Sequence, residues 1–168
     1  RLCYNSHMRI LGIDPGLATI GFGIIESEGP NCRPLDFGHI STAKTLSSAS
    51  RLNQIATDLE EICKKWQPDV CAIEELFFSK NVTTALKVAE ARGVILQTLN
   101  RAGYSVHEYN PGQIKIAVTG HGKATKPEVQ KMVTLILKLK EIPRPDDAAD
   151  ALAIALCHAH TMIHAPSL

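Results

Sequence analysis

The stretch Ile10-Leu-Gly-Ile-Asp14-Pro-Gly16 decides the fold of this chain. An apolar run that ends in Asp-Pro-Gly predicts a buried strand, Arg9–Asp14, followed by a tight turn. The alternating segment Thr19–Glu26 predicts a second strand. The two strands are expected to form a hairpin with Asp14 near its tip.

Two more strands and a helix are predicted in the first half of the chain. Pro34–Ser41 is expected to be the third strand. Ser48–Trp66 carries one apolar stripe at helical spacing, which is typical of an amphipathic helix. Val70–Glu74 is a continuous apolar run, as expected of a central strand that is covered on both faces.

The second half is predicted to be mainly helical. Helices are expected at Asn81–Asn100, from Asn110 to Val118, from Thr125 to about Lys140 and at Asp146–His164, with a strand at Gly103–Tyr109. This order predicts an α/β fold. Its mixed five-stranded sheet would have three antiparallel strands, then parallel strands, with helices on both faces.

Length and composition predict one globular domain. The chain has 168 residues, of which 45% are hydrophobic and 21% charged. Residues 1–7 are interpreted as an expression-tag remnant, because Ser6-His7-Met8 resembles the scar of a cleaved tag. The domain is therefore expected to cover residues 8–168.

The sequence predicts a cytoplasmic protein. There is no visible signal peptide, and no apolar run reaches the ~18 residues that a membrane span needs. Five cysteines, an odd number at wide spacings, are typical of reduced thiols and not of a disulfide framework.

The positive charge is concentrated in one part of the chain. The net charge is only +1, but residues 101–145 hold eight Lys or Arg against three Glu. A basic rim beside acidic residues would suit a phosphate polymer such as a nucleic acid. A lysine-rich helix face exposed to solvent explains the same residues, so this alternative stays open.

Four carboxylates are candidates for a metal site. Asp14 and Glu74 end predicted strands, while Asp147 and Asp150 are three residues apart on one helix face. If these elements meet, the acids repel one another and a divalent cation would relieve the repulsion. Oxygen ligands favour Mg²⁺ or Mn²⁺. Two such ions roughly 3.5–4 Å apart would support in-line hydrolysis of a phosphodiester.

Each acid also has a simpler explanation. Asp14 precedes Pro-Gly, where turns favour Asp. Glu74 may be read as a solvated strand end, and Asp147 and Asp150 as acids favoured by the helix dipole in a first turn. Taken together, the three segments favour a shared site over three separate explanations.

With these motifs, the chain from Met8 to about His160 resembles the bacterial RuvC Holliday-junction resolvases, which are ribonuclease H-like nucleases. The resemblance lies in four segments: Gly12-Ile-Asp-Pro-Gly16, Ala72-Ile-Glu-Glu-Leu-Phe-Phe-Ser-Lys-Asn81, Ala85-Leu-Lys with Ala91-Arg-Gly93, and Asp147-Ala-Ala-Asp-Ala-Leu-Ala-Ile-Ala155.

The resemblance implies an active site with two Mg²⁺ ions, for which Mn²⁺ may substitute. It assigns catalytic and metal-binding roles to Asp14, Glu74, Asp147 and Asp150, and catalytic or phosphate-contacting roles to Lys115 and Lys126. Some members carry His where Asp147 stands. The neighbouring acids Glu75 and Asp146 are not expected to be ligands.

The segment after Glu74 is expected to contact DNA. Phe77 matches an aromatic side chain that family members stack on or wedge between bases, and Phe78, Lys80 and Lys123 are further candidates for DNA contact. Successive side chains of a strand face opposite sides, so one phenylalanine would be exposed. The alternative is that both phenylalanines cap the core.

Two further groups of residues are candidate binding sites. His121, in a glycine-rich loop, would be able to touch a phosphate. Cys157, His160 and His164 share a helical face, so a zinc site is conceivable, although the end of a terminal helix is the favoured interpretation.

The resemblance implies an endonuclease that resolves four-way DNA junctions by paired symmetric nicks in homologous recombination and DNA repair. A junction has near two-fold symmetry, so a homodimer with two active sites fits it, with Asn81–Asn100 expected at the interface. A branch-migration motor is an expected partner.

Three alternatives remain at this stage. Another ribonuclease H-like nuclease, such as a ribonuclease H or a YqgF-type enzyme, would cut RNA or an RNA–DNA hybrid. The segment Ile13-Asp-Pro-Gly-Leu-Ala-Thr19 also resembles the phosphate-binding hairpin of actin-like and sugar-kinase ATPases. A DNA-binding scaffold without activity is the third.

Overall fold

The computed structural model describes residues 7–76 and 82–164. Their five strands are β1 (Met8–Asp14), β2 (Thr19–Glu28), β3 (Asn31–Ser41), β4 (Val70–Glu74) and β5 (Val106–Tyr109). They form one sheet in the order β3-β2-β1-β4-β5, in which β1–β3 are antiparallel and β4 and β5 are parallel to β1 and β4 respectively. The mixed sheet expected from the sequence is therefore confirmed.

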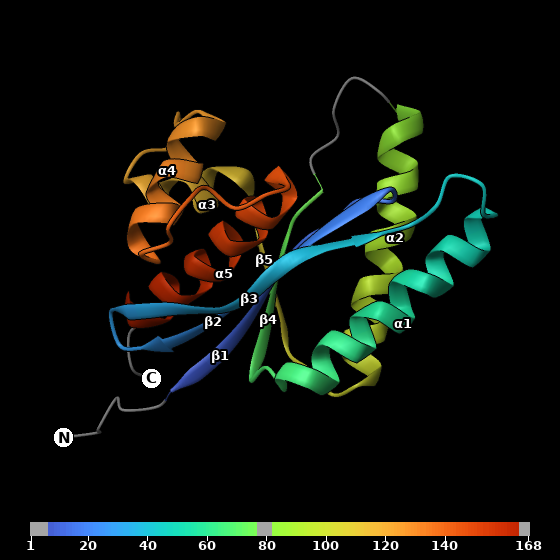
Figure 1. The fold of residues 1–168 in the computed structure, drawn as a ribbon, viewed down its shortest axis with the longest axis horizontal. Helices are drawn as coiled ribbons and strands as arrows, with labels where there is room; N and C mark the ends of the chain where they lie inside the picture. Colours follow the sequence, from blue (N-terminus) through green and yellow to red (C-terminus); the bar gives the residue numbers. More distant parts are fainter. Residues whose placement is uncertain (1–6, 77–81, 165–168) are drawn as a thin grey trace.

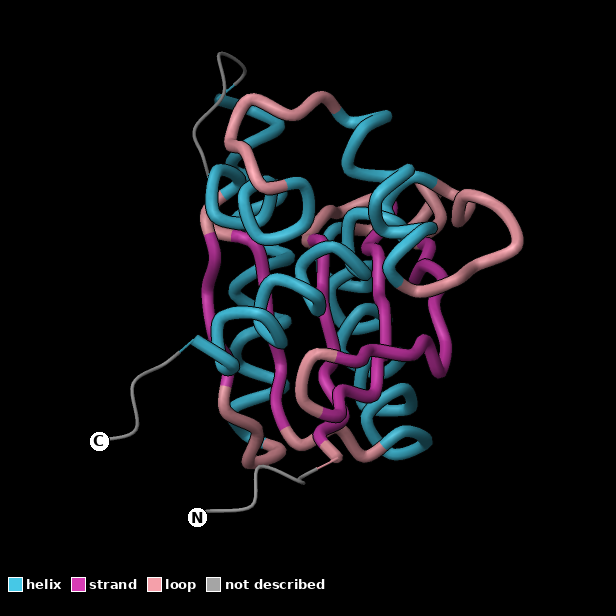
Figure 2. Tube along the Cα trace, turned by 90° about the vertical axis from the view of Figure 1, so that its left-hand side faces the viewer, coloured by secondary structure: helices cyan, strands magenta, loops and turns pink. Residues whose placement is uncertain are grey.

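Helices cover both faces of this sheet. Helices α1 (Ser48–Trp66) and α2 (Val82–Arg101) lie on one face, and α3 (Pro111–Thr119), α4 (Lys126–Ile136) and α5 (Asp146–His164) lie on the other (Figure 1). The view turned by 90° shows the strands side by side with helices stacked against them (Figure 2). None of the helices in the described ranges is long and apolar enough to span a membrane.

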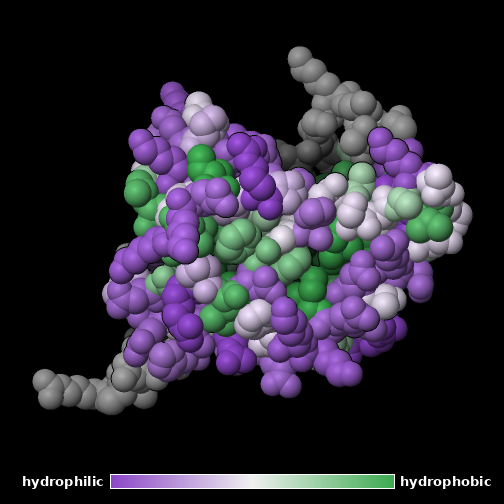
Figure 3. All heavy atoms as spheres, in the orientation of Figure 1, coloured by the Kyte–Doolittle hydropathy of each residue, from purple (hydrophilic) through white to green (hydrophobic). Residues whose placement is uncertain are grey.

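The central strand β1 divides the core in two. Leu11 and Ile13 pack with α1 and α2, while Ile10 packs with α3, α4 and α5. This alternation follows the period of two that sends successive side chains of a strand to opposite faces. Hydrophilic side chains cover much of the outside of α1 and α4, and hydrophobic ones gather between the helical layers (Figure 3).

Helix α5 approaches the sheet closely because glycines lie beneath it. Gly12 of β1 pairs with Gly23 of β2, and Gly21 pairs with Asp14. A Cβ atom at Gly12 would lie 2.1 Å from the carbonyl oxygen of Ala151, and one at Gly21 would lie 2.0 Å from that of Asp147. The missing side chains therefore let the first turns of α5 rest on the backbone of β1 and β2.

Two predicted boundaries, the end of α4 and the start of β5, were wrong because a residue with positive φ reverses the chain there. Helix α4 ends at Ile136 and not near Lys140, since Lys138 has a φ of 52° and the Leu139 N–H donates to the Thr134 carbonyl at 2.9 Å. Strand β5 begins at Val106 and not at Gly103, whose φ of 86° places it in the turn that ends α2.

Strand β3 begins three residues before the predicted Pro34. A proline is tolerated there because β3 is an edge strand, and the register with β2 shifts between Ile24 and Ile25, beside it.

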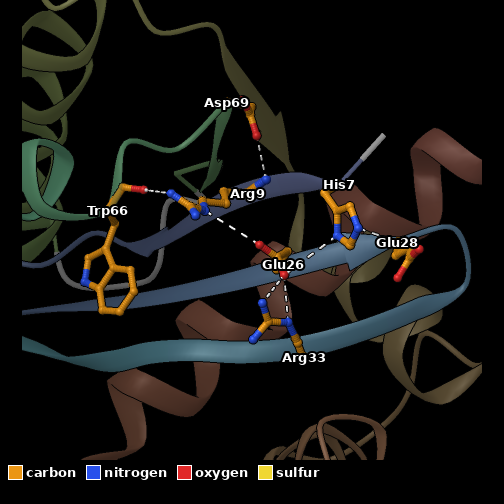
Figure 4. Close-up of polar contacts among 7 residues, drawn as sticks. All are labelled: His7, Arg9, Glu26, Glu28, Arg33, Trp66 and Asp69. Atoms are coloured by element: carbon orange, nitrogen blue, oxygen red, sulfur yellow. Dashed lines mark hydrogen bonds and ion pairs between the residues drawn. The ribbon is translucent and has the colours of Figure 1, made fainter. Parts of the chain in front are cut away.

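Ion pairs connect β1, β2 and β3 at the end of the sheet that lies away from Asp14. Glu26, only 8% exposed, accepts a 2.7 Å hydrogen bond from Arg33 Nε and lies 3.7 Å from Arg9 Nε (Figure 4). The Arg9 N–H also donates to Asp69 at 2.7 Å. His7, which was assigned to the tag remnant, lies 3.8 Å from Glu26. This network joins β1, β2 and β3 through one nearly buried carboxylate.

We predict that Gly12→Ala destabilises the protein by about 1–3 kcal/mol or more, because the new methyl group overlaps the backbone of α5. Urea unfolding measures the change. Gly122→Ala is the control: Gly122 lies in the loop between α3 and α4, where a Cβ would be 3.5 Å from the Ile116 side chain, an ordinary contact, so this variant should keep the parental stability. Equal stability of the two variants would show that α5 does not depend on the bare backbone at Gly12.

Candidate active site

Two carboxylates lie side by side at the carboxyl ends of neighbouring parallel strands. Asp14 is the last residue of β1 and Glu74 is the last residue of β4. Ile13 pairs with Ile73 in the sheet, so the residues that follow them, Asp14 and Glu74, lie opposite each other. Paired residues of adjacent strands point to the same face. Gly12 and Ala72 face α5, so Asp14 and Glu74, two residues later, face it too.

Helix α5 brings two more acids to this place. Asp147 lies in its first turn, with its backbone against Gly21, the cross-strand partner of Asp14. Asp150 follows one turn later and lines the same pocket as Asp14 and Glu74. Asp147 is not among the residues that line this pocket, although its charge acts on Asp14.

The pocket has a volume of about 190 Å³ and combines acids, lysines and apolar walls. Its lining consists of Asp14, Glu74, Asp150, Lys115, Lys126, Pro111, Ile114, Val129, Ala153 and Ile154. The apolar residues come from α3, α4 and α5. A low local dielectric strengthens every charge interaction inside the pocket.

The acids raise one another's pKa. Burial, followed by the charges of Asp150, Glu74 and Asp147, raises the pKa of Asp14 to about 8, while Lys126 acts in the opposite direction. Burial and Asp150 also raise the pKa of Glu74, against the charges of Lys126 and Lys115. The site is therefore electrostatically unfavourable when all its acids are ionised, as expected of a site for cations.

Lys126 provides part of the balancing charge. It is the first residue of α4, and its Nζ lies 2.7 Å from Asp150 Oδ2 and 3.7 Å from Asp146 Oδ2. Burial lowers the pKa of Lys126, but its hydrogen bond to Asp150 and the acidic charges around it raise that pKa overall. Lys115 of α3 lines the same pocket.

Of the other residues predicted to contact DNA, only some lie in the part of the chain that the structure describes. Lys123 and His121 lie exposed in the loop between α3 and α4. Phe77, Phe78 and Lys80 lie outside the described residues. Their predicted roles stay predictions.

The donor set of the pocket fits a hard divalent cation. All its acidic ligands are carboxylate oxygens, which Mg²⁺ and Mn²⁺ prefer, and their repulsion is the kind that a cation relieves. In residues 7–76 and 82–164, no three Asp, Glu, His or Cys side chains already lie close enough together to hold a metal ion. Lys126 on Asp150 provides the positive charge in the conformation described here.

The conceivable zinc site at the end of the chain is not supported. Cys157 is buried, and burial raises the pKa of its thiol to about 11. His160 Nδ1 lies 2.9 Å from the carbonyl oxygen of Ala117. Helix α5 continues to His164, whose side chain lies outside the described part of the chain.

Sequence reasoning missed a buried polar pair near this site. The Tyr109 hydroxyl lies 2.8 Å from His158 Nδ1, and His107 packs against the His158 ring at 4.6 Å. Burial, with the charge of His107, lowers the pKa of His158 to about 4, so this ring is neutral near pH 7. A histidine inside the apolar run of α5 was the only sequence signal for the pair.

The fold and the acidic pocket together define a nuclease of the ribonuclease H-like class. A family model described as "Crossover junction endodeoxyribonuclease RuvC" matches residues 10–158. The relative from Heliobacterium modesticaldum is 56% identical over 92% of this chain and 96% of its own length, and that from Caldicellulosiruptor saccharolyticus is 53% identical over 90% and 92%. The chain belongs to the family of RuvC crossover junction endodeoxyribonucleases, so the family predicted from the sequence is confirmed.

Solved structures agree with this assignment. Thermus thermophilus RuvC in complex with a Holliday junction substrate superposes with a TM-score of 0.89, at 40% identity, over 94% of this chain and 96% of that chain. The yeast mitochondrial resolvase Ydc2 has a TM-score of 0.67 at 13% identity, over 96% and 84%, and shares the fold.

We predict that ionisation of Asp14 destabilises the metal-free protein. In the unfolded chain Asp14 titrates near its ordinary pKa of 3.8, but in the folded chain near 8. The folded state therefore loses stability as pH rises from about 4 to about 8, and the loss is complete above pH 8. Asp14→Asn should be more stable than the parent at pH 8.5 by more than ~1.4 kcal/mol, the free energy of one pKa unit.

Urea unfolding in EDTA at pH 4.5 and pH 8.5 measures this gap. The two proteins should differ little at the lower pH. A gap that is the same at both values would contradict the assigned environment of Asp14.

Proposed function

We propose that this chain resolves four-way DNA junctions by metal-assisted hydrolysis at the pocket of Asp14, Glu74 and Asp150, with Asp147 as the fourth ligand. The observation that supports this most is the convergence of acids from β1, β4 and α5 on one pocket that also holds Lys115 and Lys126. Thermus thermophilus RuvC, 40% identical to this chain, is known in complex with a Holliday junction substrate.

In this proposal the four carboxylates hold two Mg²⁺ ions, or Mn²⁺ in their place. When bound, such ions supply Lewis acidity for the attacking water and the leaving oxygen. Lys126, beside Asp150, and Lys115, which lines the same pocket, provide positive charge for the phosphate. The apolar side chains of Ile114, Val129 and Ile154 line the same pocket and lower the local dielectric, which strengthens both effects.

DNA would reach the pocket from the basic side. Lys123 and His121 lie in the loop between α3 and α4, three and five residues before Lys126, and Phe77, Phe78 and Lys80 follow the strand that ends in Glu74. We propose that these residues bind the junction beside the cut. A branch-migration motor as partner stays a prediction.

We also propose that residues 8–168 act as one nuclease domain and that two copies pair through α2. Leu86 of α2 is 58% exposed, one of the most exposed large apolar side chains among the described residues. Pairing about a two-fold axis would place two active sites on a substrate of matching symmetry.

Cleavage of a synthetic mobile junction, with each strand labelled in turn at its 5′ end, tests the function. Symmetric nicks with ligatable ends, formed only with Mg²⁺, are expected. A junction that survives while an RNA–DNA hybrid or linear RNA is cut would leave the metal site in place and overturn the substrate.

We predict that Glu74→Gln lowers the cleavage rate at least 100-fold and leaves junction binding within a few-fold of the parent. Glu75→Gln is the matched control, because Glu75 is the next residue in the chain and is exposed. It should cut at the parental rate. If Glu74→Gln cut at the parental rate, Glu74 would be excluded as a metal ligand. The alternative of a DNA-binding scaffold without activity at this pocket would then be favoured.

We predict that Leu86→Glu shifts the protein from dimer to monomer, because two charges would be buried at the proposed interface. Sedimentation velocity at micromolar concentration measures the change. Leu135→Glu, on the exposed side of α4, is the control and should leave the dimer intact. A parent that sediments as a monomer would refute pairing.

A further inference from the structure

Arg92 is a nearly buried cation in the apolar stripe of α2. Its side chain is only 15% exposed, and its neighbours on that face, Ala91 and Ile95, are fully buried against the sheet. A guanidinium in such surroundings is costly unless polar partners satisfy its donors. Its partners therefore indicate why a cation lies here.

Both partners of Arg92 belong to the strands that carry the active site. Its Nε donates to the backbone carbonyl of Glu74 at 3.3 Å, and its Nη2 pairs with the carboxylate of Glu108. Glu108 precedes Tyr109, which is the residue of β5 that pairs with Glu74. One side chain thus joins α2 to the ends of β4 and β5.

The carbonyl of Glu74 needs a donor from outside the sheet. The N–H of Glu75 donates to Tyr109 on β5 at 2.9 Å, and successive residues of a strand direct their backbone groups to opposite neighbours. The carbonyl of Glu74 therefore faces β1. In the register Ile13↔Ile73, its donor would be residue 15, which is Pro15 and has no N–H. Arg92 Nε supplies this hydrogen bond instead.

We propose that Arg92 is a positioning residue for Glu74: it fixes the backbone at the end of β4 so that the Glu74 carboxylate is held in the pocket where the cation binds. Residues that orient a metal ligand typically contribute 10- to 100-fold to metal affinity. The inference rests on the proposed metal site and adds a residue on the opposite face of the sheet from that site.

The test compares Arg92→Met with Arg101→Met in the full chain. Arg101 is a matched control, because it also lies on α2 and pairs with a glutamate, Glu60, but is 62% exposed and lies at the far end of the helix from Glu74. The probe is Mn²⁺ alone, titrated by calorimetry, with melting temperature and junction binding in EDTA measured in parallel.

Arg92→Met should bind Mn²⁺ about tenfold or more weakly and cut bound junctions correspondingly more slowly, with junction binding in EDTA within twofold of the parent. Arg101→Met should change neither. Glu108→Gln, which keeps the bond from Arg92 to Glu74, should weaken Mn²⁺ binding by less than Arg92→Met does.

Parental Mn²⁺ affinity in a folded Arg92→Met protein would overturn the inference and leave the metal site intact. Failure of the parent itself to bind Mn²⁺ would instead refute the proposed metal site. If Arg92→Met does not fold, Arg92→Leu carries the test, since it extends the apolar stripe of α2 and removes the donor to the Glu74 carbonyl. An unchanged affinity in that variant would equally overturn the role.

Discussion

The close approach of α5 to the sheet is the constraint on which the rest of the structure depends. Gly12, Gly21 and Gly23 leave the backbone of β1 and β2 bare, and backbone and side-chain atoms of α5, among them those of Leu152 and Ala155, occupy that space. With larger residues, the helix would stand further away. Asp147 and Asp150 would then lie beyond the reach of Asp14, and the acidic pocket would not form.

The same approach creates an electrostatic cost. Acids on β1, β4 and α5 share one partly buried pocket, and burial together with their mutual repulsion raises the pKa of Asp14 to about 8. Lys126 offsets part of this repulsion through its bond to Asp150. A fold that keeps such a cluster gives up stability at a functional site, and the cluster is suited to cations. Lys115 and Lys126, which reduce the repulsion among the acids, line the same pocket and could also bind a phosphate there.

Much of the fold and of the site could be predicted because both depend on local patterns. Apolar runs that end in an acid gave β1 with Asp14 and β4 with Glu74, and the i, i+3 spacing gave the acidic face of α5. That α5 lies directly on glycines of β1 and β2 could not be predicted, since this contact depends on strand register.

Other features depend on long-range geometry and could not be predicted. Arg92 lies within an apolar stripe, and only the fold shows that it replaces the donor missing at Pro15. The early end of α4 follows from a left-handed Lys138, a conformation that the sequence does not signal at a lysine. The pairing of Tyr109 with His158 joins residues 49 positions apart.

Anomalous diffraction from crystals soaked in Mn²⁺ tests the central claim most directly, since it locates the cation without relying on activity. Mn²⁺ is expected in the pocket, within coordination distance of carboxylate oxygens of Asp14, Glu74 and the acids of α5, with Lys126 moved off Asp150. Mn²⁺ bound elsewhere on the protein while this pocket stays free of metal would contradict it.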